Sequence, residues 1–245
     1  MNFLDTLHES TSVIQRSEQW HKVRLGRFTS SEIWKICEFG KRDMTDEELA
    51  QRPKGSRVTK IEDHTILTTN GNNYILDKVA EILTGEQKQS VYSFPIQWGI
   101  EHEEIALNHF SEKMNVKIET FGFQQFGNHC GGSPDGLFFL DDEKHGVEIK
   151  CPFSSSKQIQ YLRMKSVSDL KDYYPEYYWQ CVSLMLFFDI KTWHFVTYDP
   201  RMKSEKTKMS HLIINQEQVS DDQEILTLGI QTAIKNKLEI LSELL

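Results

Sequence analysis

Apolar residues recur with helical spacing near both ends of the chain and in several stretches between them. Residues three and four apart share one face of a helix, so this spacing indicates helices that bury one side. The predicted helices cover residues 17–25, 71–85, 98–114, part of 155–168, the stretch after Pro175 and 220–245. Ser17 can cap the first helix and Gly26 can end it. Another helix is expected to begin in "TSSEIWKIC", with Thr29 or Ser30 as its cap.

In the middle of the chain, short segments are rich in β-branched and aromatic residues, and apolar side chains alternate along them as strands require. The strand candidates are "KIETFGFQQF", "GLFFL", "GVEIKCPF", "TWHFVTYD" and "MSHLIIN". Helices before and after such strands predict an α/β fold, in which helices flank a central mixed β-sheet. We expect residues 1–245 to form a single domain. The apolar residues of the last helix are expected to be Ile225, Leu228, Ala233, Leu238 and Leu241, among others.

Residues 41–62 differ from the rest of the chain in composition. They mix charges of both signs with Pro53 and Gly55, which interrupt helices and strands. This composition predicts a surface excursion with at most one helical turn. Its lysines and arginines could line a channel entrance, but its acidic residues favour an ordinary solvated loop.

Composition and charge set outer limits on the function. The chain has 245 residues and 38% hydrophobic content, enough to bury a proper core. It has no secretory leader and no apolar run of membrane-spanning length, so we expect a cytoplasmic protein without membrane contacts. The net charge of −8 argues against a surface coated in basic residues for loose nucleic-acid binding. It does not exclude an enzyme whose positive charge is concentrated in one channel.

The stretch "GGSPDGLFFLDDEKHGVEIKCPF" carries the candidate chemistry. Strand side chains alternate between faces, so Glu148 and Lys150 point the same way. If "GLFFL" and "GVEIK" pair as a hairpin, the turn "SPDG" brings Asp135 close to Glu148. Two carboxylates then share one site with a lysine beside them.

Two close, buried carboxylates repel each other unless something compensates their charge. Mg²⁺ takes oxygen ligands, and the main-chain carbonyl of Ile149 could add one to the two carboxylates. Lys150 could then orient or deprotonate a water, or neutralise the charge that develops on a phosphate. Glu103 lies on the apolar face of its predicted helix, where a carboxylate requires a partner. The alternatives are ordinary surface carboxylates and, for Glu103, pairing with a basic side chain.

Ordered motifs connect these residues to a known family. Pro134-Asp135 is followed by twelve residues and then by Glu148-x-Lys150, which is the PD-(D/E)xK nuclease pattern. The blocks "WHKVRLGRFTSSEI", "WGIEHEEIA", "SPDGL", "VEIKCPFSS" and "YDPRMK" stand in the order expected of one branch of that superfamily. From about residue 17 to about 215, the chain resembles the bacteriophage λ exonuclease, or YqaJ-type viral recombinase, family.

The resemblance implies a restriction-endonuclease-like core and assigns roles to residues. Asp135, Glu148, the Ile149 carbonyl and Glu103 would be metal ligands, and Lys150 the catalytic lysine. Arg24, Ser31 and Ser133 match positions that grip a terminal 5′-phosphate. Ser31 is expected in the first turn of a helix, where free N–H groups favour an anion, and Arg24 can donate two parallel hydrogen bonds to phosphate. The family commonly shows Gln-x-Gln after the active-site strand. Here the pattern reads Gln180-Cys181-Val182, so Gln180 is the one candidate for that catalytic role.

The function implied is a two-metal, Mg²⁺-dependent 5′-to-3′ exodeoxyribonuclease, with Mn²⁺ as a substitute. It would digest one strand of duplex DNA from a 5′-phosphorylated end and leave a 3′ single strand for phage-type recombination. The resemblance also implies a homotrimer around DNA and a single-strand annealing protein as partner, in a bacterial or phage-infected cell. The alternatives are a catalytically idle DNA-end-binding module and a structure-specific endonuclease on the same fold. The complete acidic set favours an enzyme, and Arg24 with Ser31 favours action at ends.

Overall fold

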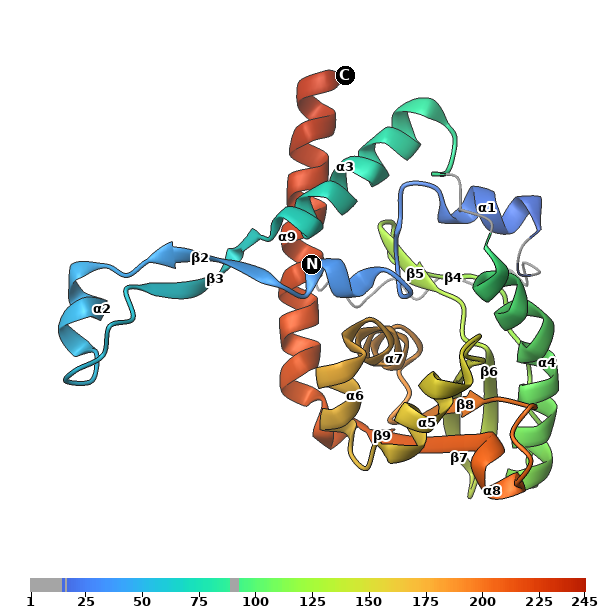
Figure 1. Cartoon of the computed structure of the whole chain (residues 1–245). Helices are drawn as coiled ribbons and strands as arrows, with labels where there is room; N and C mark the ends of the chain where they lie inside the picture. The colour runs from blue at the N-terminus through green and yellow to red at the C-terminus, as the bar shows by residue number, and fades with distance from the viewer. Residues whose placement is uncertain (1–14, 16, 89–92) are drawn as a thin grey trace.

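A four-stranded mixed sheet forms the centre of the computed structural model, which describes residues 15, 17–88 and 93–245. Its strands are β6 (Gly136–Leu140), β7 (Glu143–Lys150), β8 (Thr192–Tyr198) and β9 (Met209–Asn215), in that order across the sheet. The β7–β8 pair is parallel, whereas β6–β7 and β8–β9 are antiparallel. The predicted mixed sheet, and the hairpin that contains the acidic motif, are therefore present (Figure 1).

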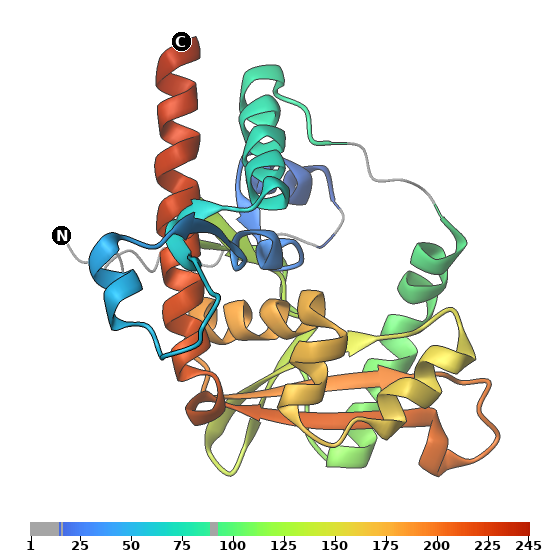
Figure 2. The same ribbon diagram turned by 60° about the vertical axis from the view of Figure 1, so that its left-hand side comes forward.

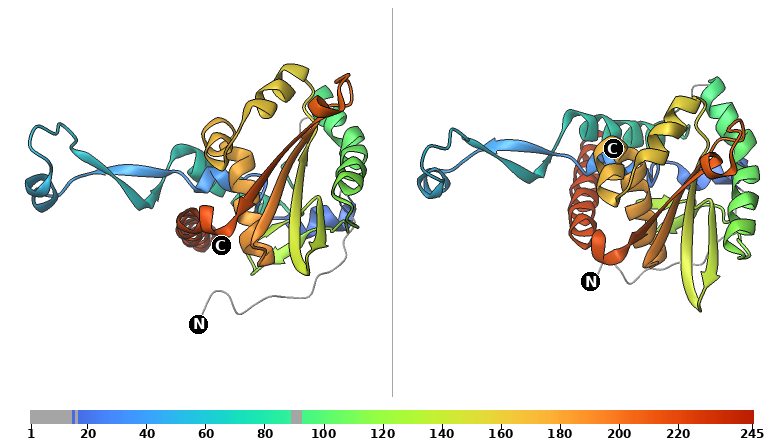
Figure 3. Two further views of the ribbon diagram at one scale, coloured as in Figure 1. Left: turned by 90° about the horizontal axis from the view of Figure 1, so that it is seen from below. Right: turned by 60° about the horizontal axis from the view of Figure 1, so that its bottom comes forward.

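Helices cover both faces of this sheet, as the sequence predicted (Figure 3). The long helix α4 (Phe94–Met114) packs on one face, where Ala106, Leu107 and Phe110 meet apolar residues of the strands. The other face is covered by α5 (Ser155–Arg163), α6 (Val167–Tyr173) and α7 (Pro175–Phe188). Because α4 and α7 lie on opposite faces of β7, groups from both helices can meet at the end of that strand.

A second group of elements surrounds a small three-stranded sheet. Its strands are β1 (Phe28–Thr29), β5 (Cys130–Gly132) and β4 (Gln124–Phe126), with β1 and β5 parallel. The helices nearby are α1 (Glu18–Arg24), α3 (Thr69–Thr84) and α9 (Ser220–Leu244). Helices α3 and α9 contact each other beside this sheet (Figure 2). These elements position the predicted phosphate-binding residues.

The apolar residues named for the last helix are only partly buried in α9. Leu228 and Leu238 are exposed, whereas Leu226, Ile230 and Lys237 are buried. Gly229 explains this rotation, because a Cβ atom there would lie 2.0 Å from the carbonyl oxygen of Ile36. Helix α9 approaches the 3₁₀ helix η1 (Ile33–Ile36) closely at Gly229, and the residues on the same face of the helix as Gly229 are therefore the buried ones.

Residues 39–67 form a projecting arm, so the surface excursion predicted over 41–62 is present, but most of it is a paired ribbon and not a loop. Strands β2 (Phe39–Asp43) and β3 (Lys60–Leu67) pair antiparallel, and α2 (Asp46–Gln51) lies at the far end. The arm extends away from the rest of the molecule (Figures 1 and 3). Alternating charged residues hid the strands, because a ribbon exposed on both faces has no apolar periodicity.

The helix expected in "TSSEIWKIC" is a short 3₁₀ helix, η1 (Ile33–Ile36), and Ser31 precedes it instead of lying in its first turn. Two further short helices are α8 (Glu205–Lys208) and η2 (Gln216–Gln218). Across the described ranges, no helix combines the length and apolar character that crossing a bilayer requires.

Candidate active site

The acidic motif lies at the open end of the β6–β7 hairpin, opposite its turn: Asp135 precedes β6, and Glu148 and Lys150 end β7. Asp141 and Asp142 form its tight turn with positive φ angles, and Gly136 pairs with Val147 at the other end. Asp135 directly precedes β6, and its Oδ2 accepts a hydrogen bond of 2.6 Å from the N–H of Ile149. The N–H and C=O of one strand residue point to the same edge, so the Ile149 carbonyl lies on the edge that Asp135 approaches.

Glu148 is the most deeply buried of the predicted acidic residues, with 1% of its surface exposed. Its Oε1 accepts hydrogen bonds from Lys150 Nζ at 2.5 Å and from Gln180 Nε2 at 2.6 Å. Gln180 comes from α7 and therefore holds Glu148 from outside the hairpin. The structure brings the predicted catalytic glutamine, glutamate and lysine together, while position 182, which is Val, lies in the apolar core.

The remaining oxygen of Glu148 provides the test of a metal site. Glu148 Oε2 is buried and receives no hydrogen bond from any described residue. Such an oxygen costs free energy unless a donor or cation satisfies it. Among residues 15, 17–88 and 93–245, no three His, Cys, Asp or Glu side chains form a ready-made ligand cluster. Mg²⁺ usually takes only one or two carboxylates and keeps its waters, so the donors present at Asp135, Glu148 and Ile149 suit it.

The electrostatics of this group are those of crowded carboxylates. Burial, together with repulsion from Glu148 and Glu103, raises the pKa of Asp135 well above its usual value. Burial also raises the pKa of Glu148, although Lys150 and Gln180 oppose the effect. For Lys150, burial disfavours the ammonium, but Glu148 and Asp135 outweigh it and raise the pKa of the lysine. The site thus keeps Lys150 protonated and would gain from additional positive charge.

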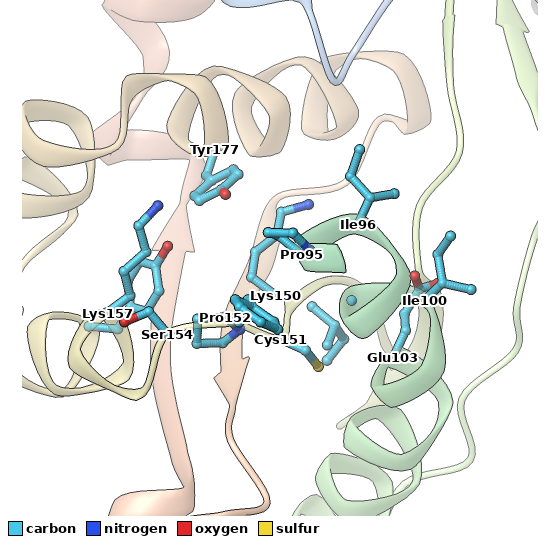
Figure 4. Close-up of a pocket in the computed structure, with 14 residues that line it drawn as sticks. Pro95, Ile96, Ile100, Glu103, Lys150, Cys151, Pro152, Ser154, Lys157 and Tyr177 are labelled. Atoms are coloured by element: carbon cyan, nitrogen blue, oxygen red, sulfur yellow. The ribbon is translucent and has the colours of Figure 1, made fainter. Parts of the chain in front are cut away.

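A hollow of about 470 Å³ opens beside these residues. Figure 4 shows Lys150 from β7 and Tyr177 from α7 on one side, with Ile96, Ile100 and Glu103 of α4 on the other. Lys150 Nζ lies 5.0 Å from the centre of the Tyr177 ring. Glu103 is half-buried and close enough to influence the pKa of both Asp135 and Glu148, as its predicted place on the inner helix face requires.

Two of the three predicted phosphate-binding residues, Arg24 and Ser133, contact Trp20. The Arg24 guanidinium stacks on the Trp20 ring, with its carbon 3.8 Å from the ring centre. Trp20 Nε1 donates a hydrogen bond of 3.0 Å to Ser133 Oγ. Strand β1 ends at Thr29, which pairs with Gly131 in parallel, and Ser31 lies in the turn that follows. Ser31 is exposed, and its Oγ lies 3.4 Å from Thr29 Oγ1.

The phosphate region adjoins the acidic site. Arg24 and Trp20 line a second hollow of about 870 Å³, and Ile96 and Ile100 of α4 line both hollows. One surface therefore runs from Arg24 past α4 to Lys150. Burial lowers the pKa of Arg24 from its usual value, although a guanidinium still carries its charge at neutral pH. A cation and a carboxylate cluster on one surface suit a substrate with successive phosphates.

Sequence reasoning missed two residues of this surface. Trp20 lies one helical turn before Arg24, and that spacing of four could have indicated a stacked pair. Tyr177 lies three residues before Gln180 on α7, which places both on one side of the helix. The next two aromatic residues of this helix, Tyr178 and Trp179, are buried in the core.

Comparison with known proteins identifies relatives of this arrangement. The family model of the YqaJ-like viral recombinase domain matches residues 19–189, which is more than half of the chain. The resemblance inferred from the sequence blocks is thereby confirmed. A search of curated proteins by sequence found no significant match.

Solved structures share the fold. An alkaline exonuclease from Laribacter hongkongensis superposes with a TM-score of 0.64 and 20% identity, over 93% of this chain and 97% of that one. The same exonuclease in complex with dAMP gives a TM-score of 0.64 and 19% identity, over 93% and 97% of the two chains. A phage-related exonuclease from Haemophilus somnus 129PT gives 0.63 and 14%, over 89% and 96%. These structures confirm the predicted fold class.

Proposed function

Because the chain belongs to the YqaJ-like viral recombinase domain family, we propose that it is a Mg²⁺-dependent exodeoxyribonuclease that digests one strand of duplex DNA from a 5′-phosphorylated end. The observation that carries this proposal is the buried, unpartnered Oε2 of Glu148 beside Asp135 and Lys150. A carboxylate pair with an unsatisfied oxygen suits a divalent cation, and phosphodiester hydrolysis is the chemistry that such cations promote.

Asp135, Glu148, Glu103 and the Ile149 carbonyl are the residues that we expect to hold two Mg²⁺ ions, with Mn²⁺ as a substitute. When bound, these ions supply Lewis-acid stabilisation of the phosphate and a more acidic water. Asp135 is held by Ile149, and Glu148 by Gln180, so both carboxylates are oriented before substrate arrives. Lys150 contacts Glu148, and we assign it the orientation or activation of the attacking water, or the stabilisation of negative charge on the phosphate.

We infer the direction of digestion from the position of Arg24. Arg24, Ser31 and Ser133 would bind the terminal 5′-phosphate, while the next phosphodiester lies over Glu148 and Lys150 along the surface lined by α4. An arginine can donate two parallel hydrogen bonds to a phosphate, and serine hydroxyls add donors. The products would be mononucleotides and a 3′ single strand suited to recombination.

One gel tests this activity. Linear duplexes labelled at either the 5′ or the 3′ end of one strand are incubated with protein and Mg²⁺. We expect the 5′ label to be released at once and the 3′-labelled strand to shorten gradually. EDTA should stop the release and the shortening. Release of the 3′ label first would reverse the polarity. Equal digestion of 5′-phosphate and 5′-hydroxyl ends would remove Arg24, Ser31 and Ser133 from substrate recognition.

The same gel distinguishes the alternative functions. Cleavage of closed circular duplex would indicate a structure-specific endonuclease, and end binding without any digestion would indicate an idle end-binding module. The hollow lined by Arg24, which shares Ile96 and Ile100 with the hollow beside Lys150, favours the exonuclease over both. Assembly as a homotrimer, a single-strand annealing partner and action in the cytoplasm of a bacterial or phage-infected cell belong to the same proposal. Light scattering that gives a monomer mass would contradict the trimer.

A further inference from the structure

The turn between α1 and β1 is held on both sides of one residue. Gly26 donates its N–H to Glu81 Oε2 at 2.9 Å, and its carbonyl oxygen accepts from Lys237 Nζ at 2.8 Å. Its φ of +67° is a left-handed conformation, and an added Cβ would lie 2.4 Å from Ile82 Cγ1. The turn is therefore fixed against α3 by one residue of that helix and by one residue of α9.

The groups that hold Gly26 are charged and buried. The exposed fractions of Glu81, Lys78 and Lys237 are 4%, 5% and 1%. Lys78 Nζ pairs with Glu81 Oε1 at 2.8 Å, which leaves Oε2 for Gly26. Replacing such buried ions by apolar residues of similar volume is often neutral or stabilising. Stability alone thus gives little reason for this cluster, whereas the position of the Gly26 main chain depends on it directly.

The same side of α3 also holds the chain on the far side of the turn. The N–H of Thr29 donates to the hydroxyl of Tyr74 at 2.9 Å, and Tyr74 lies one turn before Lys78 on α3. Gly26 follows Arg24 by two residues, and Thr29 precedes Ser31 by two. Helix α3, with Lys237 of α9, therefore fixes the segment between two of the residues that we assign to the 5′-phosphate. Helices α3 and α9 lie side by side (Figures 1 and 2).

We propose that Glu81 and Lys237 are positioning residues for end selection, which hold the Gly26 turn so that Arg24 and Ser31 fit a terminal 5′-phosphate. This inference rests on the proposed function, because it concerns recognition of the end and not hydrolysis. Paired hydrogen bonds to a phosphate tolerate little displacement, and a shift of about 1 Å can cost about 100-fold. Neither residue reaches the carboxylates at Glu148, so their loss should spare turnover.

Lys237→Met tests the inference, with Lys235→Met as the matched control on the exposed side of α9. The quantity measured is the ratio of kcat/KM for 5′-phosphate and 5′-hydroxyl duplexes of one sequence. We expect Lys237→Met to lower this ratio about tenfold with kcat at saturation nearly unchanged, and Lys235→Met to keep it. Equal loss on both ends would show a general structural role, and an unchanged ratio would likewise overturn the inference.

Glu81 gives an independent test if Lys237→Met folds poorly. Glu81→Gln keeps an oxygen that can accept from Gly26, whereas Glu81→Leu removes it. The two variants are compared by fluorescence anisotropy of end-labelled duplexes in EDTA, where no hydrolysis occurs. We expect Glu81→Leu to bind both ends alike and Glu81→Gln to retain most of the phosphate preference. If both variants keep the preference for 5′-phosphate ends, Glu81 is not a positioning residue. If the wild-type protein binds 5′-phosphate and 5′-hydroxyl ends equally, the proposed end recognition itself is wrong.

Discussion

The acidic site at the end of β7 and the phosphate region around Gly26 adjoin the same part of α4, yet different contacts build them. Glu148, Lys150 and Asp135 are placed by one hairpin, and Gln180 of α7 completes the group. The Gly26 turn is instead held by α3 and α9, and its contact with Lys237 spans 211 residues of sequence. Local sheet geometry therefore places the chemistry, whereas long-range buried contacts place the recognition. Changes in the two regions should have different kinetic effects.

Lys150→Ala should give the largest effect, because it removes a charged group that touches Glu148 directly. We expect hydrolysis to fall by about 1,000-fold or more while binding of duplex ends is kept. The assay is mononucleotide release under Mg²⁺, beside end binding by anisotropy. Lys157→Ala is the control, because Lys157 lines the same hollow but is exposed. Turnover retained by Lys150→Ala would remove this lysine from the mechanism.

Gln180→Leu should have the next largest effect. The change removes one of the two donors to Glu148 Oε1 and leaves the carboxylate oriented by Lys150 alone. Loss of such an outer partner typically costs about 10- to 100-fold in metal affinity or activity. Calorimetric titration with Mg²⁺ and single-turnover hydrolysis are the measurements, and both should weaken on 5′-phosphate and 5′-hydroxyl ends alike. A change in end preference would contradict the division between the two regions.

The sequence predicts the acidic site better than the phosphate region, because local strand geometry places the first and long-range contacts place the second. The period of two along β7 places Glu148 beside Lys150, and pairing across a tight turn brings Asp135 to Ile149. The contact of Gln180 with Glu148 joins separate elements, and family resemblance rather than residue pattern suggested it. In α9, apolar periodicity selected Leu238, whereas the close approach at Gly229 buries Lys237 instead. Such a contact depends on three-dimensional packing that no local pattern encodes.

Trp20 offers a graded test of the phosphate region. Trp20→Phe keeps an aromatic ring for Arg24 but loses the donor to Ser133, and Trp20→Leu loses both. One hydrogen bond and one cation–π contact each contribute about 1 kcal/mol, so we expect preference for 5′-phosphate ends to fall about fivefold and then further. Competition between phosphate and hydroxyl ends in one reaction gives the ratio directly. Equal ratios for wild type and Trp20→Leu would show that Arg24 needs no support from this ring.

The smallest expected effect concerns stability and separates Lys237 from every group of the acidic site. Burial lowers the pKa of Lys237 to about 8 from an ordinary value of 10.5, and the cations Arg27 and Lys78 contribute. Between these values the unfolded chain binds more protons than the folded one, so stability rises with pH.

Relative to Lys237→Met, wild type should gain about 1 kcal/mol of unfolding free energy between about pH 7.5 and 9. Urea unfolding across this range measures the difference, and Lys235→Met should follow wild type because Lys235 is exposed. Parallel curves for wild type and Lys237→Met would mean that the amine near Gly26 is not desolvated in solution. The Gly26 turn would then be held less tightly than its hydrogen bonds indicate, and the contrast with the acidic site would weaken accordingly.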